Sequence, residues 1–153
     1  MVRMTDLPQT TQTGMANLEC PVFETRPFVS GPPLAKRRVA VVSSAGLLRR
    51  GERPFVSGDV DYRVIPADTP ADQILMSHVS VNFDRTGFLR DINVVFPLDR
   101  LRAMTEAGTI GSVAETHYSF MGATDPRGME PNARAVAGRL KSDRVDGVLL
   151  TPV

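Results

Sequence analysis

The segment Arg38–Gly46 constrains the fold of this chain more than any other. Four apolar residues, three of them β-branched, follow a basic pair and run directly into two serines, an alanine and a glycine. Such a run is typical of a parallel strand that is buried on both faces and ends in a tight turn. Because α/β proteins bind ligands at the carboxyl ends of such strands, we expect Ser43 and Ser44 to bind substrate, with backbone N–H groups that could meet an anion. A plain strand-to-loop turn explains the pattern equally well, and the GxGxxG motif of dinucleotide-binding proteins is absent.

Further apolar segments alternate with helical patterns along the chain. Strands are predicted at residues 61–66, 92–96, 117–122 and 145–153, a half-exposed strand or extended loop at 79–84, one or two helical turns at 69–75, and helices at 97–108 and 131–144. This order favours an α/β fold with a mainly parallel sheet and crossover helices in Rossmann-like layers. Residues 1–33, which include Cys20, are predicted to be a flexible arm, and residues 34–153 a single α/β domain.

Composition excludes some classes of function. The formal net charge is +1, from 18 basic and 17 acidic residues, so neither nucleic acid nor a membrane surface is an expected partner. A single cysteine, Cys20, cannot form an internal disulfide, which fits a reducing compartment, and we expect a cytoplasmic protein. The two histidines, His78 and His117, are far apart in sequence and lack a cysteine cluster, so no metal site is predicted.

Polar residues concentrate between Ser77 and Leu101. The candidate catalytic residues are His78, a general acid or base, and Asp84 and Asp91, a carboxylate pair that could steer a cationic amine. A hydrogen-bonded structural histidine and two surface acids would give the same pattern. The candidate substrate-binding residues in this stretch are Asn93, Asp99 and Arg100. Asn93 could instead bind backbone in a turn, and a helix cap and a surface charge account equally well for Asp99 and Arg100.

An ordered set of segments resembles the selenoprotein B family of the glycine/sarcosine/betaine reductases and D-proline reductases. These segments are Tyr62–Pro66, Ser77-His78 with Phe83-Asp84, Asp91–Leu101, Gly108–Val113, Phe120–Gly122 and Asp146–Val153. Together they extend over residues 38–153 in order, although no single segment is as specific as a paired CxxC motif. The resemblance implies reductive cleavage of a C–N bond in a small amino acid or betaine-like amine, with reductase partner subunits.

The resemblance also implies where the reacting group lies. In this family a strand like the one ending at Thr151-Pro152-Val153 leads into a selenocysteine or cysteine, so Thr151 is expected to bind substrate and the nucleophile to follow Val153. We therefore expect a further C-terminal βα segment, with a UGA codon after codon 153, which sequencing of the downstream coding region tests. No cofactor is expected in this chain; a pyruvoyl-type carbonyl would come from a partner subunit.

Two other classes of function fit the sequence. A non-catalytic α/β module that binds a small ligand would use the same polar residues without a nucleophile. A racemase-like enzyme is less well supported, because such a site generally needs two thiols and only Cys20 is present.

Overall fold

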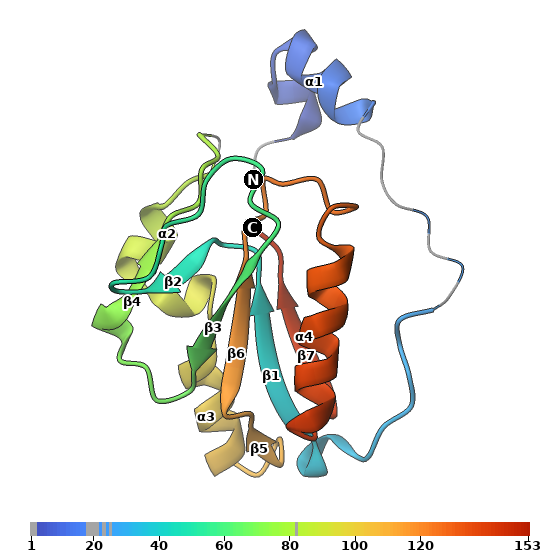
Figure 1. Ribbon diagram of the computed structural model, residues 1–153, viewed down its shortest axis with the longest axis vertical. Helices are drawn as coiled ribbons and strands as arrows, with labels where there is room; N and C mark the ends of the chain where they lie inside the picture. The colour runs from blue at the N-terminus through green and yellow to red at the C-terminus, as the bar shows by residue number, and fades with distance from the viewer. Residues whose placement is uncertain (1–2, 18–21, 23, 25, 82) are drawn as a thin grey trace.

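A computed structural model describes residues 3–17, 22, 24, 26–81 and 83–153, so the predictions for Cys20 and Asn82 lie outside the described residues. Its main sheet has five strands (Figure 1): β1 (Arg38–Ser43), β3 (Tyr62–Pro66), β5 (Ser112–Val113), β6 (Thr116–Phe120) and β7 (Gly147–Thr151). Strand β1 pairs in parallel with β7 on one side and with β5 and β6 on the other, and β3 pairs antiparallel with β6. The predicted α/β class with a mostly parallel sheet is confirmed, while the Rossmann-like layering stays a prediction.

The other elements surround this sheet. A second, two-stranded sheet pairs β2 (Leu47–Arg49) antiparallel with β4 (Ile74–Met76). The α-helices are α1 (Gln9–Ala16), α2 (Thr86–Arg90), α3 (Leu98–Glu106) and α4 (Glu130–Ser142). Short 3-10 helices are η1 (Met4–Asp6), η2 (Leu34–Lys36), η3 (Ala71–Gln73) and η4 (Ile92–Val94). Among the described residues, no helix is long and apolar enough to cross a bilayer.

Helix α3 packs the main hydrophobic core against the sheet. Its buried residues Leu98 and Leu101 lie in one cluster with Val41 of β1, Ile65 of β3 and Phe96. The helix starts directly after Pro97 and is followed by Gly108, whose φ of 70° is a backbone conformation that glycine adopts without strain. The predicted helix after Pro97 and its glycine stop are therefore confirmed.

Residues 91–96 differ from the prediction of a buried strand. The Asp91 carboxylate accepts a hydrogen bond from the backbone N–H of Asn93, which caps the 3-10 helix η4, and Val94 on that helix is 63% exposed. Short polar side chains that bond to nearby backbone compete with strand pairing. Here the bond between Asp91 and Asn93 accompanies a 3-10 helix instead of a strand. Val95 and Phe96 of this apolar segment are buried in the core, and Ile92 is partly buried against it.

Two neighbouring predictions were also imprecise. The helical turn expected over residues 69–75 is the 3-10 helix η3, and Ile74–Met76 continues directly into β4. The described residues from Val79 to Asp84 form no strand, and the backbone N–H of Ser80 donates to the Nδ1 atom of His78 instead of to a neighbouring strand. This part of the chain is the extended loop that the alternation allowed as its second interpretation.

Strand β7 lies where the sequence predicted a strand, but it is not buried. Val148, Leu149 and Leu150 are 42%, 38% and 68% exposed, because among the described strands β7 pairs with β1 only and forms an edge of the sheet (Figure 1). An apolar run therefore indicated the strand correctly and its environment wrongly. The further βα segment beyond it stays a prediction.

Candidate functional site

A pocket of about 330 Å³ lies at the carboxyl ends of β1 and β7, beside the first turns of α4. Ser43 and Thr151 are paired across the two strands, and the backbone N–H of Ser44 donates to the carbonyl oxygen of Thr151 at 3.1 Å. All three residues line the pocket, so the structure brings together these three predicted substrate-binding residues. Its other lining residues are mostly apolar: Val42, Phe120, Pro126, Met129, Ala133, Leu150 and Pro152.

The hydroxyl groups at this strand end hold the chain in place. Ser44 Oγ accepts a hydrogen bond from the backbone N–H of Val153 at 2.9 Å, and Thr151 Oγ1 donates to the carbonyl of Val95 at 3.0 Å. These bonds connect the end of β7 to the turn after β1 and to the segment before α3. Substitutions at Ser44 or Thr151 would therefore alter the path of the chain from Thr151 to Val153.

The backbone N–H groups after β1 do not form the anion site that the sequence allowed. The N–H of Ser44 donates to Thr151, that of Ala45 to Ser43 Oγ at 3.2 Å, and that of Gly46 to the carbonyl of Phe120 at 2.9 Å. Because each of these donors already has an acceptor, an anion would have to displace a bond of the fold. The strand-to-loop turn is thus a structural turn, and Ser43 and Ser44 line the pocket beside it.

His78 lies buried in the loop after β4. Its Nδ1 atom accepts a hydrogen bond from the backbone of Ser80 at 3.2 Å, its ring contacts Phe83 with centroids 4.9 Å apart, and Nε2 has no hydrogen-bond partner among the described residues. Burial, and then the positive charge of Arg85, lower the pKa of His78. A neutral imidazole with an accepting Nδ1 carries its proton on Nε2, which favours hydrogen-bond donation over proton uptake at neutral pH.

Helix α2 lies between Asp84 and Asp91 in the chain, and each carboxylate bonds to its own neighbours. Asp84 Oδ1 accepts from the backbone N–H of Thr86 at 2.8 Å, and hydrogen bonds from Thr86 lower the pKa of Asp84. Asp91 caps η4, and hydrogen bonds from Asn93 lower the pKa of Asp91. Both carboxylates are ionised in neutral solution, and both accept hydrogen bonds from residues close in sequence. Their catalytic role stays a prediction.

Asn93, Asp99 and Arg100 belong to one polar network at the start of α3. Asn93 Nδ2 donates to Asp91 at 2.8 Å and to Asp99 at 3.2 Å, while Asn93 Oδ1 accepts from the backbone N–H of Asp99 at 3.1 Å. Arg100 donates to the other oxygen of Asp91 at 3.2 Å. Pro97 is the N-cap residue of α3, and Asn93 supplies an acceptor for a backbone N–H of the first turn, the backbone-binding role that the sequence left open for it.

We expect Asn93→Ala to lower the free energy of unfolding by about 1–2 kcal/mol, the usual cost of losing a side-chain acceptor at the start of a helix. Arg100→Ala is the matched control, because it removes an exposed ion pair from the same network and should cost less than about 1 kcal/mol. Chemical denaturation measures both values. Equal effects of the two substitutions would show that Asn93 does not stabilise the first turn of α3.

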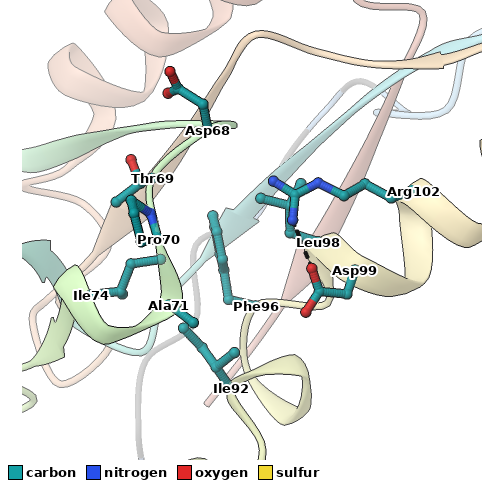
Figure 2. Close-up of a pocket in the computed structure, with 10 residues that line it drawn as sticks. All are labelled: Asp68, Thr69, Pro70, Ala71, Ile74, Ile92, Phe96, Leu98, Asp99 and Arg102. Carbon is teal, nitrogen blue, oxygen red and sulfur yellow. Dashed lines mark hydrogen bonds and ion pairs between the residues drawn. The ribbon is translucent and has the colours of Figure 1, made fainter.

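Figure 2 shows a second, smaller pocket of about 190 Å³ between the loop after β3 and helix α3. Asp99 and Arg102 lie on one side of it, joined by an ion pair of 2.7 Å, and Asp68 and Thr69 lie on the other, with Phe96 between them. Of the predicted binding residues, Asp99 alone lines this pocket. Arg102 was missed, although it follows Asp99 by three residues, the spacing that places two side chains on the same helix face.

The fold and the clustered strand ends define a class: an α/β protein with a pocket at the carboxyl ends of parallel strands. The chain belongs to the glycine/sarcosine/betaine reductase selenoprotein B family, whose model matches residues 10–153. The resemblance seen in the ordered sequence segments is thereby confirmed.

Curated relatives are subunits of reductases. The chain is 34% identical over 116 residues to D-proline reductase subunit gamma of Acetoanaerobium sticklandii, covering 74% of this chain and 47% of that protein. It is 38% identical over 74 residues to betaine reductase complex component B subunit beta of Peptoclostridium acidaminophilum, covering 48% of this chain and 17% of the relative. Glycine reductase complex component B subunit gamma of Symbiobacterium thermophilum is 28% identical in an alignment 160 residues long, gaps included, that covers 94% of this chain and 34% of the relative. The chain thus spans less than half the length of these relatives, and no solved structure matches it.

Proposed function

We propose that this chain forms part of a reductase subunit that cleaves a C–N bond of a small amino acid or betaine-like substrate at the expense of a thiol or selenol. The proposal rests on one observation: a member of the selenoprotein B family gathers Ser43, Ser44 and Thr151 around a pocket at the end of β7. In the overall reaction two electrons come from the thiol or selenol pair, which becomes a disulfide or selenosulfide. The C–N bond breaks, and C–H and N–H bonds take its place.

Within this proposal the residues described above bind and orient, and they do not supply the nucleophile. Ser44 and Thr151 hold the backbone that leads into the nucleophile-bearing segment, through the bonds to Val153 and Val95. The apolar lining beside α4 suits a soft chalcogenide nucleophile. A pyruvoyl-type carbonyl on a partner subunit would activate the amine, in keeping with relatives that are named as components of reductase complexes.

The test uses the longest polypeptide that the gene encodes, together with the subunits that copurify with it. Glycine, sarcosine, betaine and D-proline are offered with dithiothreitol, and substrate loss is followed under anaerobic conditions. We expect turnover of one of them, and a loss of at least about tenfold in kcat/KM for Thr151→Val, which keeps the side-chain volume but removes the bond to Val95. Arg134→Ala, on the exposed face of α4, is the control and should leave turnover unchanged.

Two results would overturn the proposal. One is the absence of thiol-dependent consumption of all four substrates by the folded complex. The other is equal turnover by the Thr151→Val variant and the unsubstituted protein, since the pocket at the end of β7 would then not belong to the active site.

A second function, binding of a small ligand without catalysis, is favoured by the pocket in Figure 2. Its volume of about 190 Å³ and its acidic and guanidinium groups suit a small zwitterion, with Asp68 for an ammonium. Arg102 would bind the carboxylate in exchange for its present bonds to Asp99 and to the carbonyl of Ala67. Calorimetry with the 153-residue chain separates the two functions. Binding of an amino acid that Arg102→Met abolishes, with no dependence on thiol, supports this second function.

A further inference from the structure

The hexapeptide Arg-Pro-Phe-Val-Ser-Gly occurs twice in this chain, at residues 26–31 and at residues 53–58. The two copies have the same side chains but opposite environments. Phe55 in the second copy is 3% exposed, whereas Phe28 in the first copy is 94% exposed. The phenylalanine of this hexapeptide is therefore buried in one copy and exposed to solvent in the other.

The seat of the second copy is formed by groups that recognise its phenylalanine. Phe55 packs in a cluster with Leu48, Met121 and Leu75, and the guanidinium carbon of Arg63 lies 4.2 Å from the centroid of its ring. The backbone N–H of Phe55 donates to Ser77 Oγ at 2.9 Å. We call these five residues that surround Phe55 the phenylalanine seat.

Backbone contacts extend the recognition to the start of the hexapeptide. Arg63 donates through Nε and Nη2 to the carbonyl of Arg53, at 3.3 and 3.1 Å. All of these contacts use the backbone or the phenylalanine ring, which the copy at residues 26–31 also has. Any affinity of the seat for the hexapeptide itself is therefore shared by both copies.

The first copy makes none of these contacts in the single chain. Among the residues that the structure describes, none forms a hydrogen bond or ion pair with residues 26–30, and Val29 is 83% exposed. Phe28 and Val29 are neighbouring apolar side chains in contact with water. Burying them would be favourable in proportion to the apolar area removed from water. Binding of this segment to a site that buries Phe28 would therefore lower its free energy.

A flanking residue explains why the second copy fills the seat. Asp59, which directly follows residues 53–58, is buried and pairs with Arg63 and Arg53, both at 3.3 Å. The first copy is followed by Pro32, which offers no carboxylate. The seat thus prefers its own loop by this ion pair and by the short tether, not by the hexapeptide sequence.

The first copy is poorly placed to reach the seat of its own chain. Arg37, six residues after Gly31, is held at the amino end of β1, where its carbonyl accepts from Gly111 and Ser112. The seat lies past the other end of β1, a strand that covers about 20 Å. Phe28 lies nine residues before Arg37, but Leu34–Lys36 form η2 and Arg37 Nε donates to the carbonyl of Pro32, so the segment falls short of the roughly 30 Å that nine extended residues would reach. A second copy of the chain carries no such restriction.

We infer that residues 26–31 of one copy exchange with residues 53–58 in the phenylalanine seat of a second copy. Phe28 takes the position of Phe55, under Arg63 and against Met121, and its N–H bonds to Ser77. Exchange of identical sequence elements between copies is a low-cost route to a dimer. Here the ring and backbone contacts of the seat are formed again in kind, whereas the ion pair that Asp59 contributes beside the second copy is not replaced. Ser77 directly precedes His78, one of the candidate catalytic residues.

A set of three variants tests the exchange. Phe55→Ala vacates the seat but keeps Phe28, so we expect its mass in solution to double at high concentration. Its Tm should rise by about 5 °C or more over a hundredfold increase in concentration. Phe28→Ala should remain monomeric and as stable as the original chain. Phe28→Ala combined with Phe55→Ala should remain monomeric with a Tm that does not depend on concentration.

A monomeric Phe55→Ala variant whose Tm equals that of the double variant at every concentration would overturn the inference. If the variants that lack Phe55 do not fold, the original chain carrying p-benzoylphenylalanine in place of Phe28 provides the second measurement. Illumination at high concentration should then join two copies, with the cross-link mapped to Leu48, Leu75 or Met121. Cross-links spread over the surface, or no cross-linked dimer, would equally overturn it.

Discussion

Acidification from pH 7 to pH 4 is expected to lower the free energy of unfolding by about 3 kcal/mol through His117 alone. His117 is fully buried in β6, and its burial, together with a smaller effect of the charge on Arg102, lowers its pKa from 6.5 to about 4. The Asp143 carboxylate acts in the opposite direction but more weakly. The protonated form of His117 is thus strongly disfavoured in the folded protein.

The geometry around His117 explains why it must stay neutral. β1 pairs with β5 at Arg38 and Val39 and with β6 at Val42 and Ser43, and between these pairings the backbone N–H of Val41 donates to His117 Nδ1 at 3.0 Å. The imidazole therefore closes a gap in the strand ladder. Its ring lies edge-on to Phe96, with centroids 5.6 Å apart, and a proton on Nδ1 would remove the acceptor for Val41.

The sign of the effect follows from the two protonation states. The unfolded chain binds a proton at His117 below its ordinary pKa of 6.5, and the folded chain binds it only below about 4. The stabilisation is therefore complete above pH 6.5 and decreases as the pH falls to about 4. Asp84, Asp91 and Asp125 have pKa values lowered from 3.8, so they destabilise the fold only at more acidic pH.

Urea denaturation at a series of pH values measures this effect. His117→Gln keeps an acceptor for Val41 and should flatten the slope between pH 6.5 and 4, whereas His117→Ala leaves a buried N–H unpaired at a cost of about 1–3 kcal/mol in addition to the lost packing. His78→Gln is the matched control, because burial also lowers the pKa of His78 and its share of the slope must be subtracted. An unchanged slope in His117→Gln would contradict the prediction.

The sequence predicted those parts of the fold that depend on local periodicity. Helix α3 was found from Leu98 and Leu101 with the stop at Gly108, and β1 from its apolar run, because both patterns reflect burial directly. The same reasoning predicted the burial of β7 wrongly. The same kind of apolar run indicated a buried strand, but the number of neighbours that a strand has is set by residues far away in sequence.

The candidate site was predicted less well than the fold. Ser43, Ser44 and Thr151 were brought together because the carboxyl ends of parallel strands meet at one edge of a sheet. Asp84 and Asp91 were expected as a pair because they are close in sequence, yet α2 lies between them. Arg63, which the alternation of β3 places on the same face as Ile65, was not recognised as a buried cation because its partner depends on the loop before β3.

Removal of the carboxylate at position 59 is expected to cost about 3–5 kcal/mol of stability, the range for an uncompensated buried charge. The side chains of Asp59 and Arg63 are only 5% and 10% exposed, and they meet at 3.3 Å. Asp59 also accepts the backbone N–H of Asp61 at 3.1 Å. Asp59→Ala therefore leaves the Arg63 guanidinium beside Phe55 without its buried charged partner. It also removes the acceptor for the backbone N–H of Asp61.

Asp61→Asn is the control that separates burial from charge. Asp61 faces the same Arg63 but at 3.9 Å and with 56% of its side chain exposed, so its loss should cost no more than about 1 kcal/mol. In the double variant Asp59→Ala with Arg63→Met no charge is left buried, and much of the lost stability should return. Additive effects of the two substitutions would show that the pair is not coupled. Recovery in the double variant would instead show that Asp59 acts mainly by neutralising Arg63, the residue that positions Phe55 and the loop 53–58.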